Sequence, residues 1–549
     1  MRPLDAAEDA GASGRIVDAK IAYQRTTDYF SDFAGWTLQR PLGFGGFGLA
    51  LKYRYAPPGG GGAGSRNYVV KVGLDGWNDR NIRIEADATR KVARAAHCVQ
   101  IVAPEKAGLP AAEKFEFSLL RVDDSSDSHT SSGEESRDDA PPPPPPRRRG
   151  RGRRIPERSR VHLEANIPAL NAKGATFTDR YNDAARRHNQ RVLRLRNAMN
   201  ASRAETRKWQ LDYKDYLILE CCESGELMGL IARVHQNGGR FPNRVLWSFW
   251  LCLVRACVAM SYPPRKFHPL RRSPVGPPPP PGSKVGSGVE LLGNYKRIGN
   301  DLYEDLPYRN RRWAEKKMVH FDIDPSNIFI DTIDQYTLDE EHRLVPKLKL
   351  GDFGMAHEVK PRKRNVYYDN RRFYGKAGHY APEQFGPEWD HIRESASDVP
   401  LPPDQHGSEV SGEKIAGNYG PPMNVWAVAL IMWQLITGLH PPMPPNRGRA
   451  TDRDGNRLPT HYAVLILDPD PHPPAHTGGR RRRQGQHEGY AHVDYELRHT
   501  IARCLAHDPA KRPPAGRLLE EAKRGIRKRF PGETEAMVRR WVNEYIDNA

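Results

Sequence analysis

The pattern of apolar and polar positions divides the chain into a strand-rich first part and a helical second part. Short runs of β-branched and aromatic residues, bounded by Gly and Pro, predict strands. These runs lie at 36–44, 47–55, 67–74, 114–122 and 216–222. Between the third and fourth runs, apolar positions recur at helical spacing, which predicts a helix at 78–96. One face of this helix carries Ile82, Ala86, Thr89 and Ala93.

Beyond residue 222 the apolar spacing becomes helical. Helices are predicted at 245–260, 425–439, 493–506 and 515–528. The segment 425–439 is apolar on all sides, which predicts a helix buried at the centre of a core. The expected fold class is therefore α+β, with a small, mainly antiparallel β lobe that carries one main helix, followed by a larger α-helical lobe.

Polar, Pro-rich and Gly-rich segments interrupt both lobes and are predicted to be inserts. The predicted organisation is a tail with one short helix at 1–35, a first lobe at 36–222, a second lobe at 223–530 and a tail at 531–549. Inserts are expected at about 123–209, 263–312, 386–423 and 442–490. The first of them is predicted to begin disordered and to end, at 179–209, in a solvated helix, with partner binding as the alternative. The proline runs 141–146 and 277–281 are predicted to be spacers, with SH3-like modules as alternative partners.

The chain has a formal net charge of +18, which favours acidic partners. Much of the excess lies in two arginine runs, at 147–154 and 480–483, and both runs fall in predicted inserts. We therefore predict that these arginine runs are solvated linkers or a nuclear-import signal. Binding of nucleic acid through these runs is the alternative, with steep salt dependence as its signature.

Six cysteines show neither disulfide nor zinc spacing, which indicates a reducing compartment. Cys252 and Cys257 fall in an apolar helix pattern and are expected in the core. The N-terminus lacks an apolar signal region, and the longest apolar runs are too short to span a bilayer. We expect a soluble intracellular monomer, in cytoplasm or nucleus, that does not associate with a membrane.

A glycine-rich loop, Gly43-x-Gly45-x-x-Gly48, lies between the first two predicted strands. Glycines let a backbone turn sharply and bring its N–H groups close to phosphate oxygens. A dinucleotide-binding turn would open a helix instead, so this context favours a hairpin that covers phosphates. Lys71 follows on the third strand, and Glu85 on the next helix is placed to pair with it.

Further along, His320 to Asn327 (HFDIDPSN) and Asp352-Phe353-Gly354 place two aspartates and an asparagine as phosphoryl transfer requires. Asp322 is placed to accept a hydroxyl proton. Asn327 and Asp352 are candidate metal ligands, because carboxylate and amide oxygens suit Mg²⁺.

The order of these motifs resembles that of the eukaryotic protein kinase family. In chain order they are the glycine loop, VVK, the helix glutamate, YLILECCESGEL, HFDIDPSN, DFG, YAPE, VWAVALIMWQLITG and CLAHDPAKRP. The resemblance covers about Trp36 to Lys528 with the inserts excluded, and the long inserts look like those of fungal members. It implies a bilobal kinase fold and transfer of the ATP γ-phosphoryl group, with magnesium, to a protein hydroxyl, by family base rate Ser or Thr. The alternative is a pseudokinase, a nucleotide-binding scaffold with little or no phosphotransfer.

The resemblance also implies site roles. Gly43, Gly45 and Gly48 would cover the phosphates, and Lys71, paired with Glu85, would hold them. Leu219 would line the back of the adenine pocket, the backbone of Glu220 and Cys222 would bond adenine, and Glu226 would reach the ribose. Asp322 would be the base, Asn327 and Asp352 the magnesium ligands, and Glu383 and Arg512 a structural pair.

Five positions depart from the family pattern. Phe321 replaces an arginine that receives a phosphorylated activation loop, and 355–380 contains no Ser or Thr. We therefore predict that Ser/Thr phosphorylation of this segment does not switch the protein on. Asn424 replaces an aspartate that bonds the catalytic loop, and Ala50 replaces a valine that caps adenine.

Asp324 replaces the lysine that contacts the transferred phosphate in Ser/Thr kinases. Lys376 lies five residues before Ala381, where the family has a Thr that touches that lysine. We predict that Asp324 and Lys376 form a charge-swapped pair, with Lys376 supplying the positive group. In the alternative, both side chains face solvent.

Overall fold

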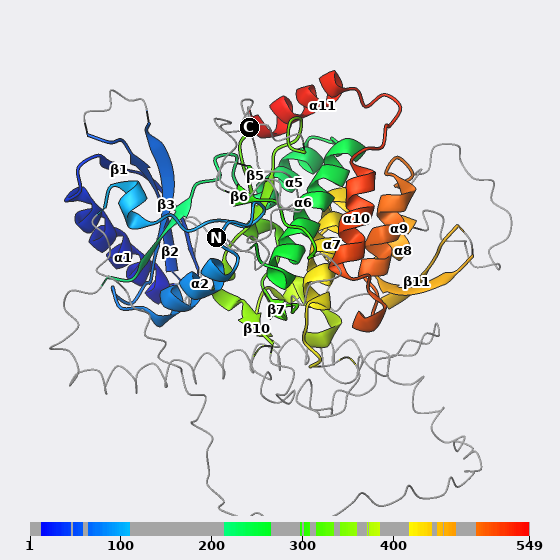
Figure 1. Ribbon diagram of the computed structural model, residues 1–549, viewed down its shortest axis with the longest axis horizontal. Coiled ribbons are helices and arrows are strands. Elements are labelled where there is room, and N and C mark those ends of the chain that lie inside the picture. Colours follow the sequence, from blue (N-terminus) through cyan, green and yellow to red (C-terminus); the bar gives the residue numbers. More distant parts are fainter. Residues whose placement is uncertain are drawn as a thin grey trace, which may run out of the picture. The chain divides into compact units, whose positions relative to one another are not determined.

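The structure is a computed structural model (Figure 1). Its described residues fall in one compact unit, drawn from 1–109 and 212–549. They are 13–45, 48–58, 64–109, 214–264, 297–298, 301–307, 314–333, 341–359, 371, 373–384, 415, 417–441, 447–453, 455–467 and 490–547. The predicted strand at 114–122, the helix at 179–209, and the arginine and proline runs lie outside this set.

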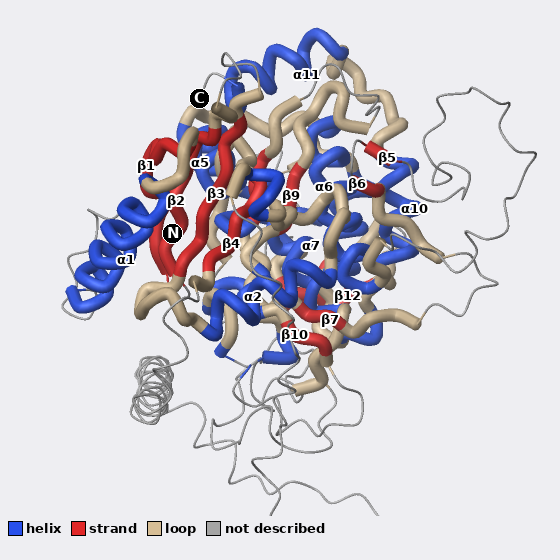
Figure 2. Tube along the Cα trace, turned by 60° about the vertical axis from the view of Figure 1, so that its left-hand side comes forward, coloured by secondary structure: helices blue, strands red, loops and turns tan. Residues whose placement is uncertain are grey.

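The first part is a four-stranded antiparallel sheet in the order β1-β2-β3-β4. Its strands, side by side in Figure 2, are β1 (Trp36–Gly45), β2 (Gly48–Tyr55), β3 (Arg66–Val72) and β4 (Tyr216–Glu220). Leu49, Leu51, Val70 and Val72 are fully buried, which explains the apolar runs. Four of the five predicted strands are thus present in the described chain.

Helix α2 (Arg80–Lys91) begins at Asp79, whose side chain accepts a hydrogen bond from the N–H of Asn81. An N-cap of this kind satisfies one of the free amides of a first turn. The helix is shorter than the predicted 78–96: it ends before Ala93, which is exposed, while Val92 is fully buried. Ile82, Ala86 and Thr89 are buried as predicted.

Residues 1–35, predicted as a tail, contain a 19-residue helix, α1 (Ser13–Ser31), which packs against β1 and β2. Its buried face carries Ala19, Ala22, Thr26 and Phe30, all fully buried. The helix is longer than the short one predicted here and it packs on the sheet; its buried face consists mostly of small or polar residues, so the packing was not apparent from the sequence. The helix also exposes Val17 and Ile21, which blurs the apolar period.

The second part is helical. Its main helices are α5 (Leu227–Gln236), α6 (Asn243–Ser261), α7 (Pro422–Thr437), α9 (Tyr495–Cys504) and α10 (Ala515–Gly525). α6 and α7 lie at its centre, and every residue from Met423 to Thr437 is buried. Among the described residues, α6 alone is long and apolar enough to cross a membrane, but 94% of its apolar stretch is buried inside the protein.

Short strands and 3-10 turns carry the loops between these helices. The strands are β7 (Met318–Val319) with β10 (His357–Glu358), and β8 (Ile328–Ile330) with β9 (Leu348–Leu350). The turns used below are Pro325–Asn327 and Phe353–Met355. Together they place the HFDIDPSN and DFG segments next to each other, because Gly351 N–H donates to the carbonyl of Asn327.

Three predicted inserts and the C-terminal tail contain packed structure. The insert at 263–312 includes β5 (Arg297–Ile298), β6 (Asp301–Leu302) and the buried Glu304. Tyr419, in the insert at 386–423, is buried. The insert at 442–490 includes β11 (Arg447–Thr451), β12 (Arg457–His461) and α8 (Val464–Leu467). The tail includes α11 (Glu535–Val542) and a π-turn (Asn543–Asp547). In the three inserts these elements are short and lie among Pro, Gly and charged residues, which concealed them.

Replacing Phe30 by Ala tests whether α1 is part of the folded domain. Phe30 contacts the rings of Trp36, Tyr53 and Tyr216 at 5.0–5.4 Å between centroids. We expect Phe30→Ala to lower the free energy of unfolding by about 3–5 kcal/mol in urea denaturation. Val17→Ala, on the exposed side of the same helix, should change it by less than about 0.5 kcal/mol. Equal small effects would show that α1 is a detached tail.

Candidate active site

The glycine loop is a hairpin turn between β1 and β2, and Gly46 and Phe47 at its tip lie outside the described residues. Gly45 pairs with Gly48 across the turn. Gly48 has φ +149°, and a Cβ there would lie 2.3 Å from the carbonyl oxygen of Val72. Gly48 is therefore required by the close approach of β2 to the end of β3. Gly43 also has positive φ, at +149°.

Lys71 is buried between two carboxylates. Its Nζ lies 2.7 Å from Glu85 on α2 and 2.8 Å from Oδ1 of Asp352. Burial alone lowers the pKa of Lys71, but the charges of Asp352 and Glu85 outweigh it and raise the pKa above the usual value. The lysine is thus held as a cation that joins the sheet, α2 and the DFG segment. The predicted Lys71–Glu85 pair is present.

His320 lies two residues before Asp322, and its side chain is fully buried. Burial lowers its pKa to about 4. Its Nε2 lies 3.1 Å from the carbonyl oxygen of Gly351, and the N–H of Asp322 approaches its Nδ1 at 3.3 Å. A neutral ring fits both contacts only with the proton on Nε2. Sequence reasoning assigned no role to His320, although its position two before Asp322 was the available signal.

Asn424 on α7 fixes the backbone at the start of the same loop. Its Oδ1 accepts a hydrogen bond from the N–H of His320 at 3.0 Å, and its Nδ2 donates to the carbonyl of Met318 at 2.8 Å. An ionised aspartate could make only the first bond. The amide therefore replaces charge by a second hydrogen bond, a compensation that the sequence did not predict.

Phe321, between His320 and Asp322, has φ +65° and is 8% exposed. Its ring meets those of Tyr374 and Tyr419 edge-on, with centroids 6.0 and 5.5 Å apart. At the position where the resembled family has an arginine, this chain thus makes aromatic contacts, one of them to Tyr374 in the segment 355–380. Residues 360–370 of that segment lie outside the described residues.

Asp322 and Asn327 are joined by hydrogen bonds. Nδ2 of Asn327 donates to the carbonyl oxygen of Asp322 at 2.8 Å and to its Oδ2 at 3.0 Å. Within the described chain, Oδ1 of Asp322 is buried without a hydrogen-bond partner. Burial, with the nearby charges of Asp324 and Asp352, raises the pKa of Asp322 to about 7. Such a group can accept a proton near neutral pH.

The residues predicted as metal ligands fit a magnesium ion in their chemistry. Asn327 uses its amide nitrogen towards Asp322, which leaves the amide oxygen as a donor atom for a cation. Asp352 uses Oδ1 for Lys71, which leaves its second carboxylate oxygen. Oxygen donors of these two kinds are the ones that Mg²⁺ takes in proteins.

Asp324 and Lys376 form an ion pair. Asp324 is fully buried, and its Oδ2 lies 2.7 Å from Nζ of Lys376, whose side chain is 49% exposed. Oδ1 of Asp324 caps the turn that follows by accepting from N–H and Oγ of Ser326, at 2.8 and 2.7 Å. Lys376 also donates to the Ser326 hydroxyl. The alternative in which both side chains face solvent is thus excluded for Asp324, and Ser326 is a partner that the sequence did not indicate.

The segment predicted to bind adenine lies at the end of β4. Leu219 packs beside Ile82 and Ala86 of α2. The N–H of Glu220 donates to the carbonyl of Gln100 at 3.0 Å, which leaves its own carbonyl as the backbone group for the predicted adenine contact. The N–H of Cys222 forms no hydrogen bond within the described residues.

Two further predicted residues border the site. Glu226 directly precedes α5; burial raises its pKa, while the charge of Lys376 opposes that rise and the charge of Asp324 adds to it. It therefore lies within electrostatic range of the catalytic loop. Ala50 is buried, 4% exposed, on β2.

Glu383 and Arg512 form the predicted structural pair. Both side chains are fully buried, and the guanidinium donates two hydrogen bonds to the carboxylate, at 2.7 and 2.9 Å. Arg512 also donates to the carbonyl of Pro422, at the start of α7. The pair therefore ties the end of the activation segment to the central helix.

Comparison with known proteins gives little beyond this geometry. No protein-family model matches the chain, and no curated protein matches it. Among solved structures, it is similar to a chain of the CAK complex from Chaetomium thermophilum bound to ATP-gamma-S. Identity is 12% and the TM-score 0.39, over 91% of this chain and 93% of the other. At these values the likeness supports no conclusion about function.

The fold class is instead evident from the structure itself. An antiparallel sheet carries one main helix, a helical part follows, and Lys71, Glu85 and Asp352 meet where the two parts touch. This is the α+β arrangement expected of a protein kinase fold.

Replacing Asn424 by Asp tests the role of the amide. The new carboxylate would face the Met318 carbonyl without a proton to donate, so we expect the free energy of unfolding to fall by about 1–3 kcal/mol at pH 8. Protonation restores a donor, so the loss should shrink as the pH falls towards 5. Urea unfolding at both pH values measures this. Asn543→Asp, at an exposed position, is the control and should change little at either pH.

Proposed function

We propose that this chain is a protein kinase that transfers the γ-phosphoryl group of ATP to a protein hydroxyl, with Ser or Thr as the acceptor. The observation that carries the proposal is the buried Lys71 held by both Glu85 and Asp352. Taking an ammonium and two carboxylates out of water is costly, so a hydrophobic residue would serve stability at least as well, and a lysine in this place can hold phosphates. The acceptor class rests on the family resemblance alone.

In this mechanism Asp322 accepts the proton of the substrate hydroxyl. Its pKa of about 7 leaves it partly ionised at neutral pH, and Asn327 holds its orientation through Oδ2. His320 fixes the backbone amide of Asp322 without adding charge. The unpartnered Oδ1 is then the atom placed to take the proton.

Asn327 and Asp352 would hold magnesium, which supplies positive charge to the phosphate oxygens. Lys71 would hold the same phosphates from the sheet side, and the glycine hairpin would cover them with backbone N–H groups. The N–H of Cys222 would bond adenine. Glu226 would reach the ribose.

Lys376 takes the place of the missing cation. Its ammonium is half exposed, whereas the Asp324 carboxylate beneath it is fully buried and fixed by Ser326. The carboxylate therefore positions the ammonium, and the ammonium is the charge that a substrate or phosphate meets. A positive group supplied from the activation segment would make that segment part of the active site.

A nucleotide-binding scaffold without phosphotransfer is the second candidate. The observation in its favour is that three carboxylates, Asp322, Asp324 and Asp352, act on one another in the site. Their mutual repulsion opposes the approach of phosphate unless Lys71, Lys376 and metal offset it.

Phosphotransfer is measured with the purified chain, labelled ATP, Mg²⁺ and a generic substrate protein. We expect labelled product, and a loss of about 100-fold or more in kcat for Asp322→Asn. Nucleotide affinity should stay within about threefold, because that residue acts on the acceptor hydroxyl. Equal signals from both proteins would leave the scaffold as the function.

The pH dependence of kcat tests the Asp324–Lys376 pair. Asp322 works ionised, so kcat should fall as the pH drops through about 7. Lys376→Met removes a charge that lowers this pKa, so the acid limb should move to higher pH and kcat should fall at least about tenfold. Lys511→Met, at an exposed lysine elsewhere, is the control.

The charge swap itself is tested by reversal. Asp324→Lys alone buries a second ammonium beside Lys376 and should abolish activity. Combining it with Lys376→Thr restores the arrangement usual in the family, and should recover activity relative to the single variant. Two results together would contradict the pair's role. They are a kcat–pH profile of Lys376→Met whose acid limb does not move, and an Asp324→Lys/Lys376→Thr double variant that is inactive.

A further inference from the structure

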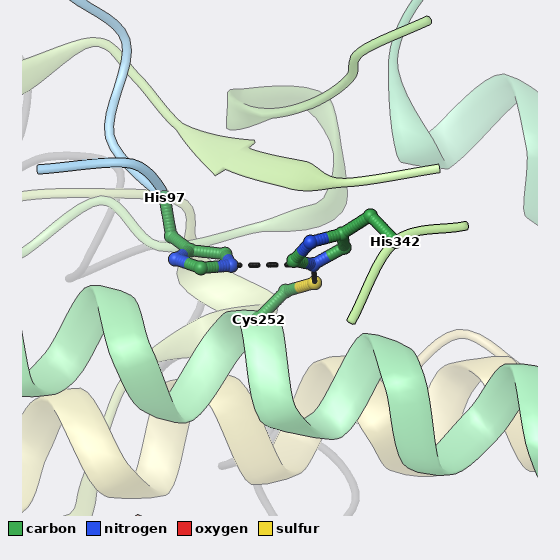
Figure 3. A group of neighbouring side chains, drawn as sticks. All are labelled: His97, Cys252 and His342. Carbon is green, nitrogen blue, oxygen red and sulfur yellow. Dashed lines mark hydrogen bonds between the residues drawn. The ribbon is translucent and has the colours of Figure 1, made fainter. Parts of the chain in front are cut away.

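Three side chains from distant parts of the sequence converge in the interior, away from the candidate active site. Figure 3 shows His97, Cys252 on α6 and His342 pointing towards one another. The two Nε2 atoms of the histidines are 3.4 Å apart, and Sγ of Cys252 lies 3.3 Å from Nε2 of His342. The histidines are 0% and 6% exposed and the cysteine 1%.

Partners outside the cluster orient both rings. Nδ1 of His97 lies 2.6 Å from Oε2 of the fully buried Glu304, and the N–H of His97 donates to Oε1 of the same carboxylate. Nδ1 of His342 lies 3.3 Å from the hydroxyl of Tyr303. Because the carboxylate accepts a hydrogen bond from Nδ1 of His97, the proton stays on Nδ1 and Nε2 carries a lone pair. That lone pair points towards the centre of the cluster. This is the arrangement found around metal-bound histidines.

The spacing of the donor atoms matches a tetrahedral ion. With Zn–N of about 2.0–2.1 Å and Zn–S of about 2.3 Å, two nitrogens lie about 3.3 Å apart, and a nitrogen and a sulfur about 3.6 Å. The observed 3.4 and 3.3 Å agree within about 0.3 Å of these values. His97 and Cys252, the third pair, lie within 4.8 Å, and closing around a cation would draw them nearer.

The surrounding charges also favour a divalent cation. Arg255, one turn after Cys252, pairs with Glu341 at 2.7 Å and donates to the backbone carbonyl of Glu304. Two positive charges from a metal ion and one from Arg255 would balance the Cys252 thiolate, Glu304 and Glu341. Such balance matters because an unpaired buried charge is costly.

We propose that His97, Cys252 and His342 bind a zinc ion as three protein ligands, with a water molecule in the fourth position and Glu304 as the carboxylate that orients His97. Imidazole and thiolate are the ligands that select zinc over magnesium, so this ion is distinct from any held by Asn327 and Asp352. Cys252 and His342 lie 90 residues apart in the sequence, and His97 and His342 lie 245 residues apart. No local spacing motif could therefore reveal them.

The position of the site gives the ion a mechanical role. His97 follows α2, and its carbonyl accepts the N–H of Leu350 at 2.9 Å, two residues before Asp352. Cys252 lies on the central helix α6. A zinc ion would thus hold the segment that follows α2 against α6 in the helical part. The bond to Leu350 places this link near Asp352.

The experiment measures bound metal and its ligands in the purified full-length chain. We expect about one zinc per chain and, after exchange with Co²⁺, thiolate-to-cobalt charge-transfer absorption with the d–d bands of a tetrahedral ion. Cys252→Ser should lose the charge-transfer bands and the stoichiometric zinc. Cys257→Ser changes another buried cysteine of α6 and should keep both.

Two further measurements test the proposal even if the Cys252→Ser variant does not fold. A zinc chelator should lower the Tm of the wild-type chain, and added zinc should restore it. Glu304→Gln should weaken zinc affinity by about 10–100-fold while the cobalt spectrum keeps its thiolate band. A wild-type chain with no zinc, no thiolate–cobalt band and no Tm shift would overturn the proposal. It would leave a hydrogen-bonded His–Cys–His network in the core.

Discussion

The burial of the Lys71 ammonium is the constraint on which the site depends. A lysine that is 3% exposed must have its charge matched, and it is matched by Glu85 from α2 and Asp352 from the DFG segment. Removing both carboxylates would leave an unpaired buried charge, a change that costs about 3–5 kcal/mol. The sheet, the helix and the loop are therefore held together by one cation, and the distances between them follow from its reach.

Much of the site could be predicted because its residues lie at short, fixed separations within elements. Asp322 and Asn327 are five residues apart in one loop, so their contact is local. The Lys71–Glu85 pair follows from a strand followed by a helix. The approach of Lys376 to Asp324 was predicted from two departures from the family pattern, an aspartate where a lysine is usual and a lysine where a threonine that touches it is usual. Its role in transfer stays a prediction.

Other features could not be predicted, because they depend on contacts between distant segments. Asn424 serves the loop through its amide, which is visible only when Met318 and His320 are both in place. Helix α1 has too little apolar surface to be recognised, and its burial depends on the aromatic side chains of the sheet. Glu304, inside a Pro-rich insert, is fully buried because His97 and Arg255 surround it.

Phe321 has a consequence for how the activation segment is held. Its ring meets Tyr374 and Tyr419 through apolar edges, at the position where the kinase family that the sequence resembles has an arginine. Contacts between aromatic rings neither titrate nor weaken in salt, whereas a charge pair near the surface does both. The same segment is also held by the half-exposed Lys376–Asp324 ion pair, so raising the ionic strength would weaken that contact and leave the aromatic one in place.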